Sequence, residues 1–306
     1  MREYRFAVAT ALATFLLLVI GGLVHPTGSS LACPDWPLCN GMVFPPMRGG
    51  ILYEHGHRLA ALAVTVLTVA LAIVVFRARR ERALRRLALL AVALVGVQAS
   101  LGALTVIYRL PLVVSASHLA TSMAFFSLVI YLAHRLRPDG AWAPPVGRGL
   151  VGLAAAAIYL QIVLGALVRH TGSSLACGTD LVLCDGAAWP AWGPAQVHML
   201  HRLVGYLVAA LVVASALRTW RLAADGPPVR RRLALLAPAL VAAQVTLGLL
   251  TVASYVSLPI VALHLAVGAA LLAAQLTLFL LLGPRGASLA RATVQPSTAL
   301  ASEATP

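Results

Sequence analysis

The stretch Glu54-His55-Gly56-His57-Arg58 opens a long apolar run, and the rest of the chain can be related to it. A counterpart, His198-Met199-Leu200-His201-Arg202, opens another apolar run 144 residues later. The last two residues of the stretches are the same, and the first histidine of the second stretch stands where the first stretch has Glu54. This similarity predicts that the chain is a tandem duplication.

Three further matches support the duplication. They pair Thr27–Cys33 with Thr171–Cys177, Gln98–Gly102 with Gln244–Gly248, and His118 with His264. Each copy therefore carries a histidine pair, residues 57 and 118 in the first and residues 201 and 264 in the second.

The composition is that of an integral membrane protein. The chain has 306 residues, of which 60% are hydrophobic and only 10% are charged, whereas about a quarter of a soluble protein is charged. A bilayer core of roughly 30 Å requires about 20 apolar residues per helix. Eight runs are long enough, at about 4–24, 53–76, 87–107, 112–134, 150–168, 196–218, 233–253 and 259–282. Because backbone polar groups must be paired in lipid, we expect eight transmembrane helices.

We expect these helices to form two tandem, pseudo-symmetric four-helix bundles. The predicted bundles cover residues 1–134 and 150–283, with a linker at 135–149 and a disordered tail at 284–306. The first run could be a signal peptide, but its apolar core is long and it has a repeat partner in the fifth run, so we expect it to be retained.

The net charge of +14 comes entirely from arginine. The arginines cluster at the N-terminus and in alternate connections, after the second, fourth, sixth and eighth runs. The positive-inside rule places these segments and both termini in the cytoplasm, with the protein in the cell membrane. The charge is explained by orientation in a lipid bilayer, so no nucleic-acid partner is expected.

The same topology places residues 25–52 and 169–195 outside. These two loops hold all four cysteines, as the pairs Cys33/Cys39 and Cys177/Cys184. In an oxidising compartment such pairs favour one disulfide per loop, and thiols kept for redox exchange remain an alternative. Zinc is not expected, because the gaps are wide and no local histidine pair completes a site.

The histidine pairs are the strongest sign of function, because a histidine in a membrane helix is costly. His57, His118, His201 and His264 all fall near the outer ends of their helices, and Glu54 and His57 are expected in the first turn of theirs. Two imidazoles from separate helices of a bundle suit the two axial positions of a heme iron. The other histidines have no matching partner in the repeat or lie at a helix end; they are His25, His55, His134 and His170.

Glu54 is the main chemical difference between the copies, because His198 takes its place in the second. A carboxylate three residues before a heme ligand can pass protons or stabilise positive charge. The alternative is a carboxylate that favours the start of a helix. Arg58 and Arg202 are candidate contacts for heme propionates, and as anchors at the membrane interface they would be explained almost as well.

The chain resembles the heme A synthase family over all eight runs. The resemblance rests on Gly21-Gly-Leu-Val24 with Thr27-Gly-Ser-Ser30, Cys33-Pro-Asp-Trp-Pro-Leu-Cys39-Asn-Gly41, Glu54-x-x-His57-Arg58, His118, His198-x-x-His201-Arg202 and His264. It implies an oxidoreductase that converts the C8 methyl of heme O, through an alcohol, to the formyl group of heme A. Here His25-Pro26 stands where an Arg-Leu or Arg-His pair is common in the family, which puts in doubt only a minor contact above the first helix.

The resemblance also assigns roles to the residues. The substrate heme O would lie between His57 and His118, and a permanent heme b between His201 and His264. Glu54 matches the functionally important glutamate and Cys33/Cys39 the N-terminal cysteine pair. Cys177/Cys184, which is not present in every member, is expected to be a stabilising disulfide. Heme O synthase and cytochrome oxidase assembly factors are the implied partners, and homo-oligomerisation is left open.

Three other functions fit the sequence less well. A di-heme b-type electron carrier would need hemes on opposite sides of the membrane, whereas all four histidines lie toward the outer side. A quinone-linked thiol oxidoreductase would leave the duplicated histidines unexplained. A transporter with parallel repeats would need broken helices and polar groups at the midplane, which the chain lacks.

Overall fold

The computed structural model describes residues 1–138, 148–222 and 228–283, and within these ranges the chain is helical apart from its loops. The elements are α1 (Arg2–Val24), α2 (Gly50–Ala78), α3 (Arg82–Ile107), α4 (Leu112–Leu136), α5 (Arg148–His170), the short 3-10 helix η1 (Ser173–Leu175), α6 (Gly193–Leu222), α7 (Pro228–Ala253) and α8 (Leu258–Leu281). In the described ranges all eight α-helices are long and apolar enough to cross a membrane. The prediction of an all-α, multi-pass membrane protein is confirmed.

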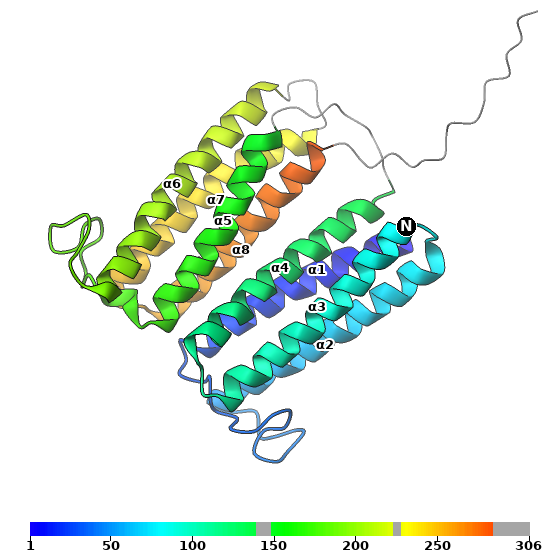
Figure 1. Cartoon of the computed structure of the whole chain (residues 1–306), viewed down its shortest axis with the longest axis horizontal. Coiled ribbons are helices and arrows are strands. Elements are labelled where there is room, and N and C mark those ends of the chain that lie inside the picture. The colour runs from blue at the N-terminus through cyan, green and yellow to red at the C-terminus, as the bar shows by residue number, and fades with distance from the viewer. Residues whose placement is uncertain (139–147, 223–227, 284–306) are drawn as a thin grey trace, which may run out of the picture.

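The helices form two four-helix bundles that lie side by side (Figure 1). In the first, each of α1 and α3 packs against both α2 and α4, and in the second each of α5 and α7 packs against both α6 and α8. It follows that α2 lies diagonally opposite α4, and α6 diagonally opposite α8. The exact boundaries expected for the bundles stay a prediction; residues 139–147 and 284–306, which include most of the linker and the whole tail, lie outside the described residues.

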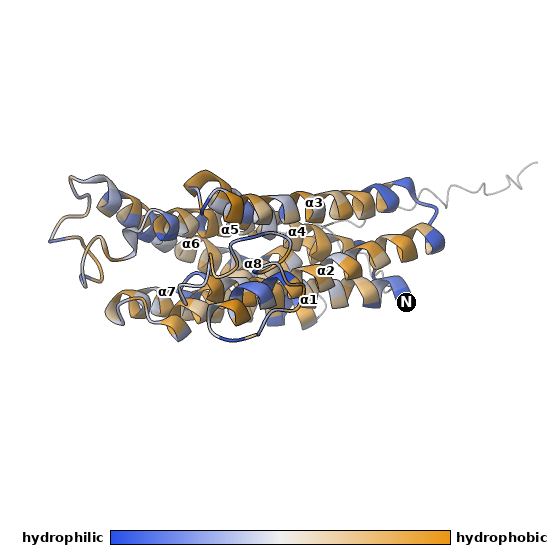
Figure 2. Cartoon of the chain, turned by 90° about the horizontal axis from the view of Figure 1, so that it is seen from below, coloured by the Kyte–Doolittle hydropathy of each residue, from blue (hydrophilic) through white to orange (hydrophobic). Residues whose placement is uncertain are grey.

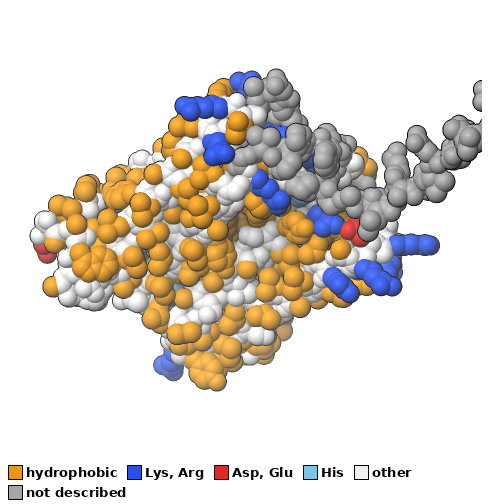
Figure 3. Space-filling view, turned by 45° about the horizontal axis from the view of Figure 1, so that its top comes forward, with side chains coloured by type: hydrophobic (Ala, Val, Ile, Leu, Met, Phe, Trp, Pro, Cys, Tyr) orange, Lys and Arg blue, Asp and Glu red, His pale blue; other side chains and the backbone are white. Residues whose placement is uncertain are grey.

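The two ends of the molecule differ in chemistry. The long loops at residues 25–49 and 171–192 lie at one end, here called the loop end, and the N-terminus and the α2–α3 connection lie at the other, here called the arginine end (Figure 1). Apolar residues cover the helices between the two ends (Figure 2). On the face shown in Figure 3 the arginines gather toward one side of a largely hydrophobic surface. This pattern is that of a protein surrounded by lipid around its middle.

Apolar side chains close the arginine end of the first bundle. Ala7, Val75, Ala88 and Leu132 come from its four helices, and all are at most 1% exposed. A second cluster joins the two bundles through the helices that face each other, with Leu18 of α1, Phe126 of α4, Ile158 of α5 and Leu272 of α8. Gly22 allows α1 to approach α8 closely, since a Cβ there would lie 2.2 Å from Cδ2 of Leu265.

The duplication is visible in the backbone as well as in the sequence. The α3–α4 turn has positive φ angles at Arg109 and Leu110, and the α7–α8 turn has them at Tyr255 and Val256. In each turn the second of these residues donates its N–H to a threonine carbonyl at the end of the preceding helix, at 2.7 Å and 2.8 Å. Two unrelated turns would not share this uncommon conformation, so the copies fold in the same way.

One detail of the sequence prediction is wrong. Helix α2 begins at Gly50 rather than near Tyr53, so Glu54 lies in its second turn and its first turn has no acidic residue. His57 is one turn deeper still. Since the helix dipole acts mainly within the first turn, a favourable helix start does not explain Glu54, and its partners must be sought in the tertiary structure.

Labelling with a membrane-impermeant maleimide in intact cells can test which end of the molecule faces the cytoplasm. Val182 is 61% exposed in the second loop, and Arg80 is exposed at the arginine end. If the arginine end is cytoplasmic, Val182→Cys will be labelled in intact cells and Arg80→Cys only after permeabilisation. The native cysteines are all in disulfides and do not compete. The reverse labelling pattern would show that the loops face the cytoplasm.

Candidate functional site

The four histidines of the two pairs lie near the loop end, inside the bundles. His57 and His118 lie on the diagonal helices α2 and α4, and His201 and His264 lie on the diagonal helices α6 and α8. The two members of a pair thus approach the bundle interior from opposite sides.

Each of these imidazoles lies against a glycine of the preceding helix. A Cβ on Gly21 would lie 2.7 Å from Cε1 of His57, and one on Gly102 would lie 3.1 Å from Cε1 of His118. The corresponding distances in the second bundle are 3.1 Å for Gly165 with His201 and 3.3 Å for Gly248 with His264. Any larger residue would push the ring away, so the glycines set where the four rings lie. The sequence marks Gly21 only as part of a motif and does not single out Gly165, so the role of both glycines is apparent only from the packing.

Glutamine amides are the nearest polar neighbours of the rings. The Nε2 atoms of Gln98 and Gln244 lie 3.3 Å from Nε2 of His118 and His264, respectively. In the sequence these two glutamines stand out only as matching positions of the repeat. Nδ1 of His57, His118 and His264 is buried without a hydrogen-bond partner.

These features fit a heme in each bundle. Two imidazoles on diagonal helices suit the coordination of one iron. All four histidine side chains are only partly buried, whereas the apolar residues that close the arginine end are fully buried. A buried imidazole nitrogen without a partner is uncommon in a finished protein interior. The assignment of His57, His118, His201 and His264 as iron ligands stays a prediction, and the residues present are suited to it.

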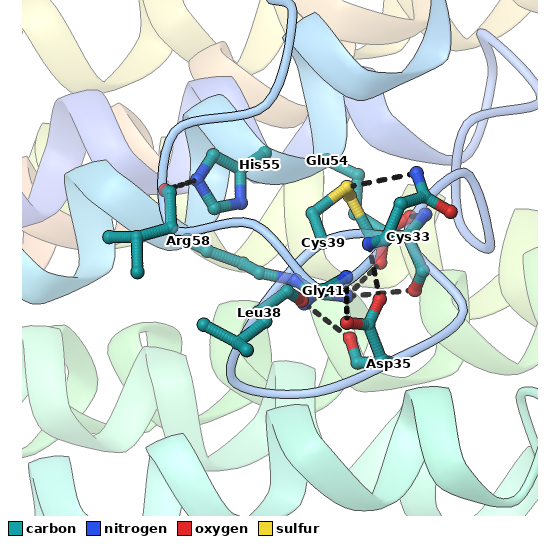
Figure 4. Close-up of a disulfide and its surroundings, with 10 residues drawn as sticks. Cys33, Asp35, Leu38, Cys39, Gly41, Glu54, His55 and Arg58 are labelled. Atoms are coloured by element: carbon teal, nitrogen blue, oxygen red, sulfur yellow. Dashed lines mark hydrogen bonds and ion pairs between the residues drawn. A yellow bond between two sulfur atoms is a disulfide. The ribbon is translucent and has the colours of Figure 1, made fainter.

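Glu54 is held by two donors at the entrance to the first bundle (Figure 4). It is 4% exposed. Its Oε1 accepts a hydrogen bond from Nη2 of Arg58 at 2.6 Å, and its Oε2 accepts one from the backbone N–H of Cys33 at 2.9 Å. A buried carboxylate is stabilised only when it is paired and hydrogen-bonded. Both conditions are met, so Glu54 has a fixed position three residues before His57.

Arg58 connects this carboxylate to the first cysteine loop. Its Nη1 donates to the carbonyl oxygens of Asp35 and Leu38, both at 2.7 Å, and its Nη2 donates to that of Cys33 at 3.0 Å. These partners give Arg58 a loop-holding role that the sequence did not suggest. The predicted contact of Arg58 with a heme propionate stays a prediction.

Asp35 stabilises the tip of the same loop. Its carboxylate accepts the backbone N–H groups of Gly41 at 2.8 Å and Asn40 at 2.6 Å, and these bonds hold the pKa of Asp35 below its usual value. A group whose pKa is lowered by folding stabilises the fold at higher pH and loses this contribution as pH falls through the lowered pKa. The hydrogen bonds of Asp35 to the backbone of Asn40 and Gly41 therefore stabilise the tip of the loop at neutral and mildly acidic pH.

The second bundle has a different arrangement at the same place. His198 replaces Glu54, and its Nε2 accepts a hydrogen bond from Nε of Arg202 at 3.2 Å. Nη1 of Arg202 donates to the carbonyl oxygen of Leu183 at 3.0 Å, while its Nη2 is buried without a hydrogen-bond partner. A buried guanidinium with a free donor suits an anionic group. Of the two arginines predicted to contact propionates, Arg202 thus has a buried donor nitrogen left for such a group.

Both cysteine pairs form disulfides, Cys33 with Cys39 and Cys177 with Cys184. The four cysteines are at most 3% exposed. Thiol–disulfide exchange needs access to a sulfur atom, so their burial favours structural bonds over the redox alternative. The second disulfide packs against Met199 and Ala195.

His55 was set aside in the sequence analysis because Met199 takes its place in the second copy, but the structure places it beside the first disulfide (Figure 4). Ligand atoms of His55, Cys33 and Cys39 lie within 4.8 Å of one another. The sequence offered no local histidine pair for a metal site at these cysteines, and the structure brings one histidine, His55, beside them. The two sulfurs are bonded to each other, and Nε2 of His55 lies 2.9 Å from the carbonyl oxygen of Val43, so the imidazole helps to hold the loop.

With this geometry established, comparison with known proteins identifies the family. A family described as "Cytochrome oxidase assembly protein" (COX15-CtaA) matches residues 4–50 and 48–276. The chain belongs to this family.

Among the relatives in this family, several carry the name heme A synthase. The heme A synthase of Geobacillus kaustophilus (strain HTA426) is 31% identical over 269 residues, which cover 85% of this chain and 84% of the relative. That of Bacillus pumilus (strain SAFR-032) is 31% identical, over 67% of this chain and 72% of the relative. That of Halalkalibacterium halodurans is 32% identical, over 71% and 76%.

The role of Arg58 can be tested through the first disulfide. Arg58→Met removes four hydrogen bonds, and each is worth about 1 kcal/mol net, so the loop should open more often. Reduction of Cys33–Cys39 by a water-soluble phosphine, followed by alkylation and mass spectrometry, should be at least about tenfold faster than in the unsubstituted chain. Cys177–Cys184 in the same molecules is the control and should be unchanged. Unchanged reduction of Cys33–Cys39 would contradict the loop-holding role.

Proposed function

We propose that this protein is a heme A synthase. In this reaction the C8 methyl group of heme O is oxidised stepwise, through an alcohol, to the formyl group of heme A, which is used to assemble heme–copper terminal oxidases. The observation that carries the proposal is a family match over nearly the whole described chain, combined with a histidine pair on the diagonal helices of each bundle. The enzyme class would be an oxidoreductase acting on a methyl group.

In this proposal the first bundle binds the substrate. His57 and His118 approach from α2 and α4, and Gly21 and Gly102 set the depth of their rings. These two imidazoles would hold heme O. In the second bundle His201 and His264 would hold heme b, which supplies one-electron redox chemistry when bound.

Glu54 is the residue that would make the first bundle the reactive one. It is the carboxylate nearest in sequence to His57, and Arg58 and the N–H of Cys33 fix its two oxygens. Oxidation of a methyl group to an alcohol and then to an aldehyde releases protons, and a fixed carboxylate can accept a proton or stabilise positive charge. His198 at the same place carries no fixed negative charge, so the second bundle lacks this function.

The competing functions are less well supported by the geometry. All four histidines lie near the loop end, which does not suit electron transfer across the membrane. The sulfurs of both disulfides are buried, which does not suit a thiol oxidoreductase. In the proposed setting the protein lies in the cell membrane with both termini cytoplasmic, and it would receive heme O from heme O synthase and work with oxidase assembly factors.

The role of Glu54 predicts a separation of binding from turnover. Glu54→Gln keeps the size and one acceptor oxygen but removes the charge, so heme should remain bound while heme A formation falls by about 100-fold or more. Heme extracted from membranes supplied with heme O would be separated by chromatography to measure heme A and its alcohol precursor. Turnover close to that of the unsubstituted protein would exclude Glu54 from the chemistry.

The division between the bundles gives a second prediction. His201→Ala and His264→Ala should deplete heme b, because each removes an iron ligand of the second bundle. His57→Ala and His118→Ala should leave heme b bound and mainly impair conversion of heme O. The pyridine hemochrome spectrum of each purified variant reports the heme species retained. Loss of the same heme from all four variants would contradict two separate sites.

A further inference from the structure

The two bundles differ in the hydrogen bonding of the first histidine of each pair, which is His57 beside α1 and His201 beside α5. Gln161 of α5 places its Nε2 atom 3.0 Å from Nδ1 of His201, and the same nitrogen donates to the carbonyl oxygen of His201 at 2.7 Å. The repeat spacing of 144 residues relates Gln161 to Leu17 of α1. A leucine offers no hydrogen bond, and Nδ1 of His57 is buried without a partner.

A second position, occupied by Gly205 or Ala61, differs between the bundles together with the position of Gln161 or Leu17. A Cβ on Gly205 of α6 would lie 3.0 Å from Nε2 of Gln161, so the glycine provides the space in which the amide lies. The residue at the same place in the first copy is Ala61. Amide and glycine thus occur together in the second bundle, and leucine and alanine together in the first.

The opposite ring of each bundle does not show this difference. His118 and His264 each have a glutamine amide at 3.3 Å from Nε2, a glycine at the back of the ring and an unpartnered Nδ1. Their surroundings differ in one place: the amide of Gln98 also donates to Ser122, and the second copy has Gly268 there. The direct contacts of these two rings are otherwise matched, and the contrast in direct ring contacts is between His57 and His201.

We infer that Gln161 is a positioning residue that holds the ring of His201, and that Leu17 and Ala61 leave His57 without this restraint. The second bundle would then release heme more slowly than the first. This inference rests on the proposed function, in which one heme is a substrate that has to leave and the other stays.

The physical basis is the geometry of the imidazole edge. A histidine that binds iron through Nε2 carries its proton on Nδ1 and is oriented by the group that accepts this N–H. In the structure Nε2 of Gln161 faces Nδ1 and also donates to the carbonyl oxygen of His201. To accept from the Nδ1–H of an iron-bound ring, the carboxamide would turn over, present Oε1 and give up its bond to that carbonyl. The Oε1 atom of Gln161 is buried without a partner, and hence available. A ring fixed in this way loses less conformational freedom when it binds iron, and it leaves iron less readily.

The test compares heme release from each bundle of the full-length protein. The double variant His57→Ala/His118→Ala leaves heme sites only in the second bundle, and His201→Ala/His264→Ala leaves them only in the first. Each is purified in lipid nanodiscs, loaded with iron protoporphyrin IX and mixed with excess apomyoglobin. The Soret band reports the transfer rate, and thermal unfolding of each protein checks that it is folded.

In the second bundle Gln161→Met should speed release by about fivefold, the factor expected for one net hydrogen bond. Gln161→Glu, which keeps an acceptor, should restore most of the retention. In the first bundle Leu17→Gln with Ala61→Gly should slow release by about the same factor, whereas Leu17→Met, which adds no hydrogen bond, should change nothing.

Folded Gln161→Met protein that releases heme at the unsubstituted rate would overturn the inference. So would a Leu17→Gln/Ala61→Gly protein with no slower release than Leu17→Met. If the protein with all four histidines binds no heme, both the inference and the proposed function fail. If it binds heme and forms heme A, but the substitutions at positions 161, 17 and 61 leave the rate of heme release unchanged, the inference alone fails.

Discussion

The contact between an imidazole and a glycine backbone, repeated four times, is the constraint on which the site depends. A histidine is costly in a membrane helix, and here each ring is accommodated because the preceding helix has no side chain at the point of contact. The glycine lets two helices approach closely enough to fix the ring inside the bundle. The diagonal placement of the histidine helices then brings two rings toward one interior. A side chain in place of one of these glycines would force the ring or its helix to shift, most of all at Gly21.

On this symmetric frame a small number of substitutions separate the two halves. Glu54 against His198 changes the charge at the entrance, and Leu17 with Ala61 against Gln161 with Gly205 changes the support of one ring. Both differences lie near the first histidine of each pair, while the glutamine contact of the second histidine is the same in both copies. A duplicated bundle can therefore acquire two roles without a change of fold.

The first cysteine loop is part of the site rather than a separate element. Arg58 donates to three of its backbone carbonyl groups, and the loop returns the N–H of Cys33 to Glu54. The disulfide shortens the loop so that these groups converge on one guanidinium. Burial of the sulfurs follows from this convergence. The position of the carboxylate thus depends on a loop outside the helices.

The sequence by itself determined the membrane class, the eight helices and the duplication, because apolar runs of about 20 residues have one stable solution in lipid and because the repeat is direct. It also singled out His57, His118, His201 and His264, since polar residues in such runs are rare. The tertiary structure decided what depends on contacts between distant segments. The loop partners of Arg58, the contact of His55 with Val43 beside the disulfide and the amide of Gln161 on His201 all join residues 12 to 40 positions apart. Spacing along a helix does not encode such contacts, because they arise only when the loops and neighbouring helices are packed together.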